Sequence, residues 1–182
     1  MDSLQNTILY DTVVSNDVPR VQQLIELGAD VNGYGGRSLI YACQYGTLDM
    51  VECLVQHGAN ISVGIGEPLK SASYRGNLLI VQYLIKMGAD VLLDDNRALR
   101  YAVAGNHLDV LIHLVDSGAK ANDCALVWAC SLGFTDIVKY LISRGADASM
   151  MDNTCITQAR LNGHKDIVEI LLQHGAQFRK EY

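Results

Sequence analysis

Histidine is the residue type in this sequence best suited to ligate zinc or to move a proton near neutral pH. His57 and His174 each stand just before a glycine, where a partial positive charge would suit the last carbonyls of a helix. No two histidines have a spacing that places both on one helix face as metal ligands. The five are His57, His107, His113, His164 and His174. The sequence therefore predicts no zinc site.

Two segments resemble parts of ligand-binding loops. The oxygen-rich segment from Asp90 to Asn96 lacks the alternating ligands and the closing bidentate glutamate of a calcium loop. Gly64-Ile65-Gly66 matches part of a dinucleotide fingerprint, but no strand precedes it and no third glycine follows. We interpret the first segment as a solvated loop and the second as a turn, and Asn32-Gly33-Tyr34-Gly35-Gly36 receives the same interpretation as the second.

The cysteines do not form a pattern typical of a disulfide framework or a redox motif. Their number is odd, none forms a Cys-x-x-Cys pair, and most lie in apolar helical patterns. They are Cys43, Cys53, Cys124, Cys130 and Cys155. We expect buried free thiols in a reducing compartment, so the predicted location is intracellular and cytoplasmic.

No spacing typical of an enzyme active site occurs in the chain. The nucleophile elbow Gly-x-Ser-x-Gly, the zinc motif His-Glu-x-x-His and the Walker phosphate loop are all missing from the sequence. We therefore expect no catalytic residues, no metal and no cofactor, and we predict that the protein is not an enzyme.

Charge and hydropathy narrow the class of partner. The formal net charge is −6 and lysine and arginine do not cluster, which argues against nucleic acid or an anionic membrane as the partner. No window offers the ~18 consecutive apolar residues of a membrane span. The first six residues lack a basic stretch followed by an apolar core, so they do not resemble a secretory signal. The remaining expectation is a protein partner.

An internal repeat defines the elements that must carry any binding surface. Six Gly-Ala pairs recur at steps of 30 residues, with one step of 27. Leucine stands four residues before each glycine, and aliphatic residues stand three and seven before it, which is the apolar stripe of an amphipathic helix. The glycines are Gly28, Gly58, Gly88, Gly118, Gly145 and Gly175. We expect each glycine to end its helix in the left-handed conformation.

A second apolar pattern precedes each of these helices. It ends on an alanine, and four residues later comes a turn residue that tolerates the left-handed region. The turn residues are Gly46, Gly76, Asn106, Gly133 and Gly163, with Asn16 in the first copy. Acidic residues then open the following helix, where they suit the helix dipole. Each unit is predicted to be helix–turn–helix–loop.

These elements resemble the ankyrin repeat family over about the whole chain. Pro68-Leu69, Gly163-His164 and Gly88-Ala89-Asp90 match the family's Thr-Pro-Leu-His, Gly-His and Gly-Ala-Asp elements in outline. The resemblance implies a structural hydrogen bond for His107 and His164. The form of the repeat is also similar to ankyrin-repeat proteins of large DNA viruses that infect amoebae.

The predicted fold is therefore an all-α ankyrin-type solenoid in one domain, residues 1–182. Its approximate repeats are 5–34, 35–64, 65–94, 95–121, 122–151 and 152–182, of which the first and last should act as caps. Family repeats run ~33 residues, and the deficit lies between Gly-Ala and the next first helix. We therefore expect short inter-repeat loops in place of the family's protruding fingers, and weakly capped starts of the first helices.

The resemblance implies that the first helices line a concave, partner-binding face. On that face the residue before each motif alanine and the residue four positions later should be exposed. The predicted partner-binding residues are Tyr41, Tyr45, Tyr74, Arg75, Tyr101, Trp128 and Leu132. The alternative is that the aromatic side chains only pack between neighbouring first helices.

We therefore predict a non-enzymatic protein-interaction module, with a binding groove centred on Tyr101 and Trp128. The viral resemblance implies that the partner is a host protein in the host cytoplasm. Two alternatives remain open at this stage: a scaffold that self-associates as a homodimer, and a scaffold subunit of an enzyme complex. The chain itself is expected to be a monomer or a homodimer.

Overall fold

The computed structural model describes residues 2–177, apart from the side chains of residues 2, 3 and 150–152. This part of the chain contains twelve α-helices and no β-strand. The first helices of the six pairs are α1 (Asp2–Val14), α3 (Gly33–Tyr45), α5 (Val63–Arg75), α7 (Leu93–Ala104), α9 (Asp123–Leu132) and α11 (Met150–Leu161). The second helices are α2 (Val18–Glu26), α4 (Leu48–Gln56), α6 (Leu78–Lys86), α8 (Leu108–Asp116), α10 (Thr135–Ser143) and α12 (Lys165–Gln173).

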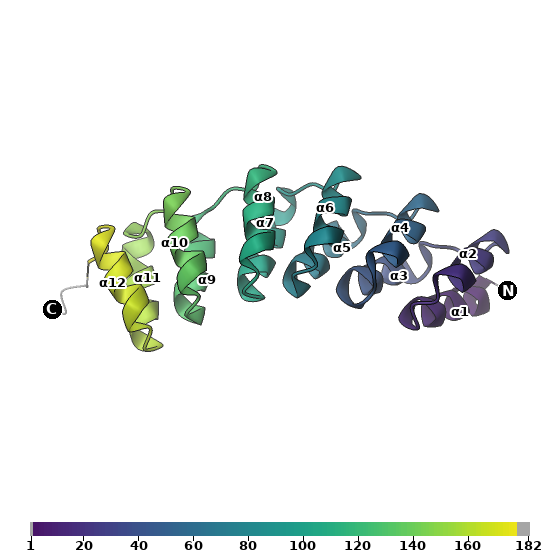
Figure 1. Cartoon of the computed structure of the whole chain (residues 1–182), viewed down its shortest axis with the longest axis horizontal. Coiled ribbons are helices and arrows are strands. Elements are labelled where there is room, and N and C mark those ends of the chain that lie inside the picture. The colour runs from purple at the N-terminus through teal and green to yellow at the C-terminus, as the bar shows by residue number, and fades with distance from the viewer. Residues whose placement is uncertain (1, 178–182) are drawn as a thin grey trace.

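The helix pairs stand side by side in a single row that follows a shallow arc (Figure 1). Neighbouring first helices pack more closely against one another than neighbouring second helices do. The exposed surface of α1, α3, α5, α7, α9 and α11 is called the first-helix face below.

The apolar stripe of the second helices builds the core as expected. The leucine four residues before each terminal glycine is buried in all six pairs. The position three before the glycine is only partly buried, and Leu172 in α12 is 44% exposed. Leu172 and Val168 are more accessible than their counterparts because no further pair packs against α12 in the described chain.

The predicted helix ends are confirmed in all six copies. The terminal glycines have φ between 88° and 105°. The alanine after each glycine donates its N–H to the leucine carbonyl five residues earlier, at 2.9–3.0 Å, and the glycine donates to the carbonyl three earlier. This hydrogen-bond pair is the Schellman motif, which satisfies carbonyls that the helix end leaves open.

The turns between paired helices follow the prediction with one exception. Asn106 adopts φ 59° and Asn16 adopts φ 58°, so asparagine replaces glycine in the left-handed region as expected. Gly46 does not: its φ is −88° and its ψ is −171°. The Gly46 N–H instead donates to the Ala42 carbonyl four residues earlier, which is the hydrogen-bond pattern of an α-helix.

The inter-repeat turns before α3, α5 and α7 are short, and each of these three is a single left-handed turn fused to the start of the first helix. Three consecutive residues have positive φ at Tyr34–Gly36, at Gly64–Gly66 and at Asp94–Asn96. The N-caps of α3, α5 and α7 make no side-chain cap hydrogen bond, as the weak capping signal predicted. Because the left-handed residues of α5 end at Gly66, Pro68 lies in the first right-handed turn of this helix, where a missing N–H does no harm.

The repeat of 27 residues lacks this left-handed turn. Asn96 accepts the N–H of Lys120 at 3.1 Å, and Asp123 accepts the N–H of Asp147 at 3.0 Å, so Asn96 and Asp123 hold equivalent places. The three missing residues therefore precede Asp123. Helix α9 begins directly after Asn122, whose side chain caps it by accepting the Ala125 N–H at 3.0 Å.

Candidate functional site: pockets on the first-helix face

The predicted partner-binding residues all lie on first helices, but they form two separate groups. Tyr45 is 55% exposed, Tyr74 44%, Tyr101 37%, Trp128 49% and Leu132 44%, and Arg75 is also exposed. Tyr41 is the exception, because it is partly buried against the core.

The group nearer the N-terminus is a stack of rings and one guanidinium. Tyr41 meets Tyr10 edge-on with ring centroids 5.8 Å apart, and it meets Tyr45 at 5.0 Å. The Arg75 guanidinium lies 5.0 Å from the Tyr45 ring centroid, within the range of a cation–π contact. These side chains bridge α1, α3 and α5, so Tyr41 here packs between neighbouring first helices.

The central group encloses a pocket of about 490 Å³. Tyr74 of α5 meets Tyr101 of α7 edge-on, with ring centroids 6.0 Å apart and an interplanar angle of 89°. Trp128 of α9 and the small Ala104 of α7 also line this pocket. The groove centre predicted from spacing, Tyr101 with Trp128, therefore lies in one pocket.

A second pocket of about 420 Å³ adjoins the first. The two share Tyr74, Ala104 and Trp128, so Trp128 borders both. The remaining walls of the second pocket come mainly from α9, which contributes the apolar Val127 and Leu132 and the polar Ser131, while Gln158 lies on α11. Leu132 is thus placed beside Trp128 as its spacing of four residues predicts.

The pockets lie where the stack is loosest. Helix α7 packs less closely against α9 than against α5, and α8 packs less closely against α10 than the other neighbouring second helices pack. Figure 1 shows the wider separation between the α7/α8 pair and the α9/α10 pair. The missing left-handed turn falls at this junction, since it would have preceded α9.

Two arginines of this pocket were missed by the sequence reasoning. Arg97 and Arg100 line the first pocket together with Tyr101 and Ala104. The signal was present in the spacing, because residues 97, 100, 101 and 104 follow the i, i+3, i+4, i+7 pattern of one helix face. Of that face, only Tyr101 was among the predicted partner-binding residues.

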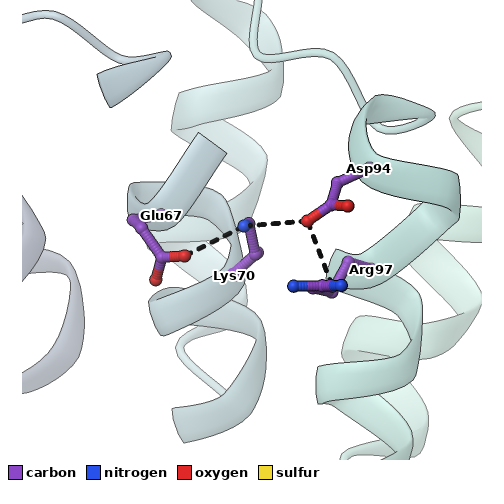
Figure 2. A network of polar contacts seen from close by, with 4 residues as sticks. All are labelled: Glu67, Lys70, Asp94 and Arg97. Atoms are coloured by element: carbon purple, nitrogen blue, oxygen red, sulfur yellow. Dashed lines mark hydrogen bonds and ion pairs between the residues drawn. The ribbon is translucent and has the colours of Figure 1, made fainter. Parts of the chain in front are cut away.

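Arg97, which lines the first pocket, also belongs to a network of polar contacts (Figure 2). The Lys70 Nζ lies 2.9 Å from Glu67 Oε1 and 3.2 Å from Asp94 Oδ2. The same Asp94 oxygen lies 3.0 Å from Arg97 Nε. The contact from Lys70 to Asp94 joins α5 to the left-handed turn of α7, so it connects two repeats.

Two histidines fix the backbone beneath the pockets. His107 Nε2 donates to the Tyr74 carbonyl at 3.0 Å, and His164 Nε2 donates to the Ser131 carbonyl at 3.2 Å. Both carbonyls belong to pocket-lining residues. The structural hydrogen bonds implied for these histidines are confirmed. His57 and His174 likewise contact the carbonyls of Cys53 and Ile170, one turn earlier in their own helices.

None of the cysteines lines either pocket on the first-helix face. The five cysteines are free, and only Cys124 is not buried. Burial raises the pKa of the Cys43 thiol, and a hydrogen bond with Cys155 together with burial raises the pKa of Cys130. Within residues 2–177, no three His, Cys, Asp or Glu side chains are grouped as metal ligands would be. No helix in that range is long and apolar enough to span a membrane.

Comparison with known families gives two matches. The family described as "Ankyrin repeats (3 copies)" matches residues 1–65 and 99–181. The family described as "Ankyrin repeats (many copies)" matches residues 69–115. Together these matches include all six helix pairs.

One curated protein and one solved structure are similar to the chain. "Putative ankyrin repeat protein L279" of Acanthamoeba polyphaga mimivirus is 36% identical over 53 residues, which is 29% of this chain and 11% of that protein. The chain thus matches only a small part of that relative's length. The crystal structure of the human ASB11 ankyrin repeat domain has a TM-score of 0.83 and 22% identity, over 95% of this chain and 86% of that one. At this identity the likeness shows the fold alone, and it confirms the predicted all-α ankyrin solenoid.

Proposed function

Because the chain belongs to the ankyrin repeat family, whose repeats are protein–protein interaction modules, we propose that it binds another protein through its first-helix face. The binding site in this proposal is the pair of adjoining pockets around Trp128. The bound protein supplies whatever chemistry follows, because the family fold is in general a non-enzymatic scaffold.

The observation that carries this proposal is the position of Trp128. Its side chain borders both pockets and remains 49% exposed, so half of a large aromatic surface is left for a partner. Tryptophan, tyrosine and arginine are the residues most enriched at binding hot spots. All three types line the first pocket.

The proposed setting is intracellular. Five free cysteines, four of them buried, suit a reducing compartment. The likeness to a mimivirus protein supports a viral form of the repeat. In this proposal the partner is a host protein met in the host cytoplasm.

Self-association is a second candidate, supported by apolar side chains at both ends of the stack. Leu4 is 66% exposed and Ile8 39% in α1, and Leu172 is 44% exposed in α12. Stacking of end repeats between two chains would cover them. Light scattering at micromolar concentration separates the two candidates, since a monomeric mass excludes the homodimer.

The proposal is tested by affinity capture followed by mass spectrometry, using the wild-type chain and three variants. Trp128→Ala and Tyr101→Ala alter the pocket, and Leu79→Ala removes a 65% exposed leucine from the second helix α6. A partner that is retained by Leu79→Ala and lost by both pocket variants, all three remaining folded, supports the proposal. Equal capture by all variants contradicts it.

A further inference from the structure

We propose that the pocket around Arg100 takes a carboxylate from the partner, which presents an acidic side chain there and a neighbouring apolar side chain to the adjoining pocket. This inference rests on the proposed function and names the chemistry of the bound segment. The partner segment is thus acidic and apolar in alternation, and its carboxylate completes an interaction that the chain itself leaves open.

Arg100 carries a buried side-chain donor that has no hydrogen-bond partner, and its residue lines this pocket. Its Nε is buried and has no hydrogen bond, and no ion pair involves Arg100 among the residues that the structure describes. Buried donors in folded proteins are nearly always satisfied, so an unsatisfied one in a residue that lines a pocket calls for an explanation. A carboxylate is the acceptor that matches a guanidinium best.

The equivalent residue one repeat earlier shows what is missing. Lys70 stands 30 positions before Arg100, and its ammonium pairs with Asp94 in the left-handed turn of the following repeat (Figure 2). Arg100 faces the repeat of 27 residues, in which that turn is deleted. The segment from Ala119 to Asn122 contains no carboxylate. Arg100 therefore has no counterpart of the Lys70–Asp94 ion pair among the described residues.

The charges around the pocket favour an anion. The network of Glu67, Lys70, Asp94 and Arg97 contains two positive and two negative groups, so it is neutral as a unit. Arg100 adds one uncompensated positive charge, and no acidic residue lines the pocket. This is a local positive site in a chain whose formal net charge is −6. Charge complementarity therefore selects an acidic segment from among possible partners.

The adjoining pocket supplies the apolar half of the recognition. It shares Trp128 with the Arg100 pocket, and Val127 and Leu132 contribute apolar walls. One extended segment can place an acidic side chain on one side of Trp128 and an apolar side chain on the other.

The test is selection of a displayed library of random 12-residue peptides on the intact chain. Binding of each selected peptide is then measured from the emission of Trp128, the single tryptophan. Arg100→Gln removes the charge and Arg100→Lys keeps it. Arg37→Gln is the matched control, because Arg37 occupies the place of Arg97 two repeats earlier and lies outside the pockets. Circular dichroism verifies that each variant is folded.

We expect the selected peptides to be enriched in aspartate or glutamate and to bind Arg100→Gln at least about tenfold more weakly than wild type. Arg100→Lys should recover part of that loss, Arg37→Gln should bind as wild type, and replacing the peptide acid by its amide should reproduce the loss. Neutral selected peptides, or acidic ones that bind Arg100→Gln unchanged, overturn this inference while leaving the proposed function intact. Binding to Trp128→Ala is measured by the fluorescence anisotropy of a label on the peptide. If the selected peptides bind Trp128→Ala as tightly as wild type, both this inference and the proposed function are overturned. Both are also overturned if the selection yields no binding peptide.

Discussion

Lys70 shows at the scale of single residues how neighbouring repeats are joined. Its side chain is only 5% exposed, and its ammonium is held by carboxylates on its own helix and on the next repeat. A buried charge is tolerated when it is paired and hydrogen-bonded, and removing one partner leaves it poorly compensated. The ion pair is therefore a structural contact between repeats, with Arg97 oriented by the same aspartate.

Asp94→Asn tests this contact. The amide keeps the size of the side chain and tolerates the left-handed backbone, but it removes the charge that faces Lys70. Because the Asp94 side chain is 27% exposed, we expect a loss of about 1–3 kcal/mol in the free energy of unfolding. Urea denaturation measures it.

The neighbouring residue provides the control. Asp95 has the same left-handed conformation, is exposed, and forms no ion pair among the described residues. Asp95→Asn should change the free energy of unfolding by less than about 0.5 kcal/mol. Equal effects of the two substitutions would show that Asp94 acts only through its backbone position.

At the scale of elements, the left-handed turns before α3, α5 and α7 replace protruding loops. Ile65 holds φ 59° and ψ 51° with a β-branched side chain that is 64% exposed. A residue other than glycine in this region costs roughly 1–2 kcal/mol, and this isoleucine buries little surface in return. The turn is therefore strained at Ile65.

Ile65→Gly should stabilise the chain. Relief of the strain exceeds the extra backbone entropy of glycine, so we expect a gain of about 0.5–1 kcal/mol in unfolding free energy. The midpoint of urea denaturation would then rise with an unchanged slope. A lower midpoint would mean that the isoleucine side chain makes contacts that outweigh its backbone strain.

Restoring the missing turn before α9 tests how the pocket arises. Replacing Asn122 and Asp123 by the five residues Leu92 to Asn96 returns the repeat to 30 residues and brings an acid toward Arg100. We expect peptides selected on the wild-type chain to bind this variant at least about tenfold more weakly, since an internal carboxylate then competes for the guanidinium. Isothermal titration measures the affinity, and unchanged binding would argue that the deletion does not create the site.

The helix pairs could be predicted because each helix end is determined by residues that are close together in the sequence. A glycine four residues after a leucine fixes both the apolar stripe and the Schellman end, and six copies agree. Gly46 could not be predicted, since glycine permits a left-handed φ without requiring it. The left-handed turns were expected only as turns, because Tyr34 and Ile65 go against local preference there.

The candidate site was predictable only in part. Spacing placed Tyr101 and Trp128 on one face, which the pocket reflects. Arg100 was not predicted as a site residue. Its proposed role depends on whether the next repeat places an acid beside it, and this depends on how the two repeats pack at their junction. Tyr41 was expected on the surface but packs between Tyr10 and Tyr45, a contact that a single repeat does not reveal.

At the scale of the whole molecule, stability is a sum over repeats and the interfaces between neighbours. Leu84 in α6 and Leu171 in α12 are both fully buried, but only Leu84 has helix pairs on both sides among the described residues. The middle repeats should therefore hold the array together, and the last pair should open by itself.

Truncation of these two leucines tests that expectation. Leu84→Ala should lower the free energy of global unfolding by about 2–5 kcal/mol. Leu171→Ala should mainly raise the rate of amide hydrogen exchange in α11 and α12, with a smaller effect on the central helices. Uniform acceleration of exchange along the chain in Leu171→Ala would instead indicate a single cooperative unit.

In the proposed function, the half-exposed Trp128 on the first-helix face is the anchor for a protein partner. The most direct test is the dissociation constant of a captured partner for the wild-type chain and for Trp128→Ala, with thermal unfolding recorded for both. A hot-spot residue contributes at least about 2 kcal/mol, so binding should weaken by more than about tenfold while the melting temperature changes little. Equal dissociation constants for two folded proteins would contradict the account.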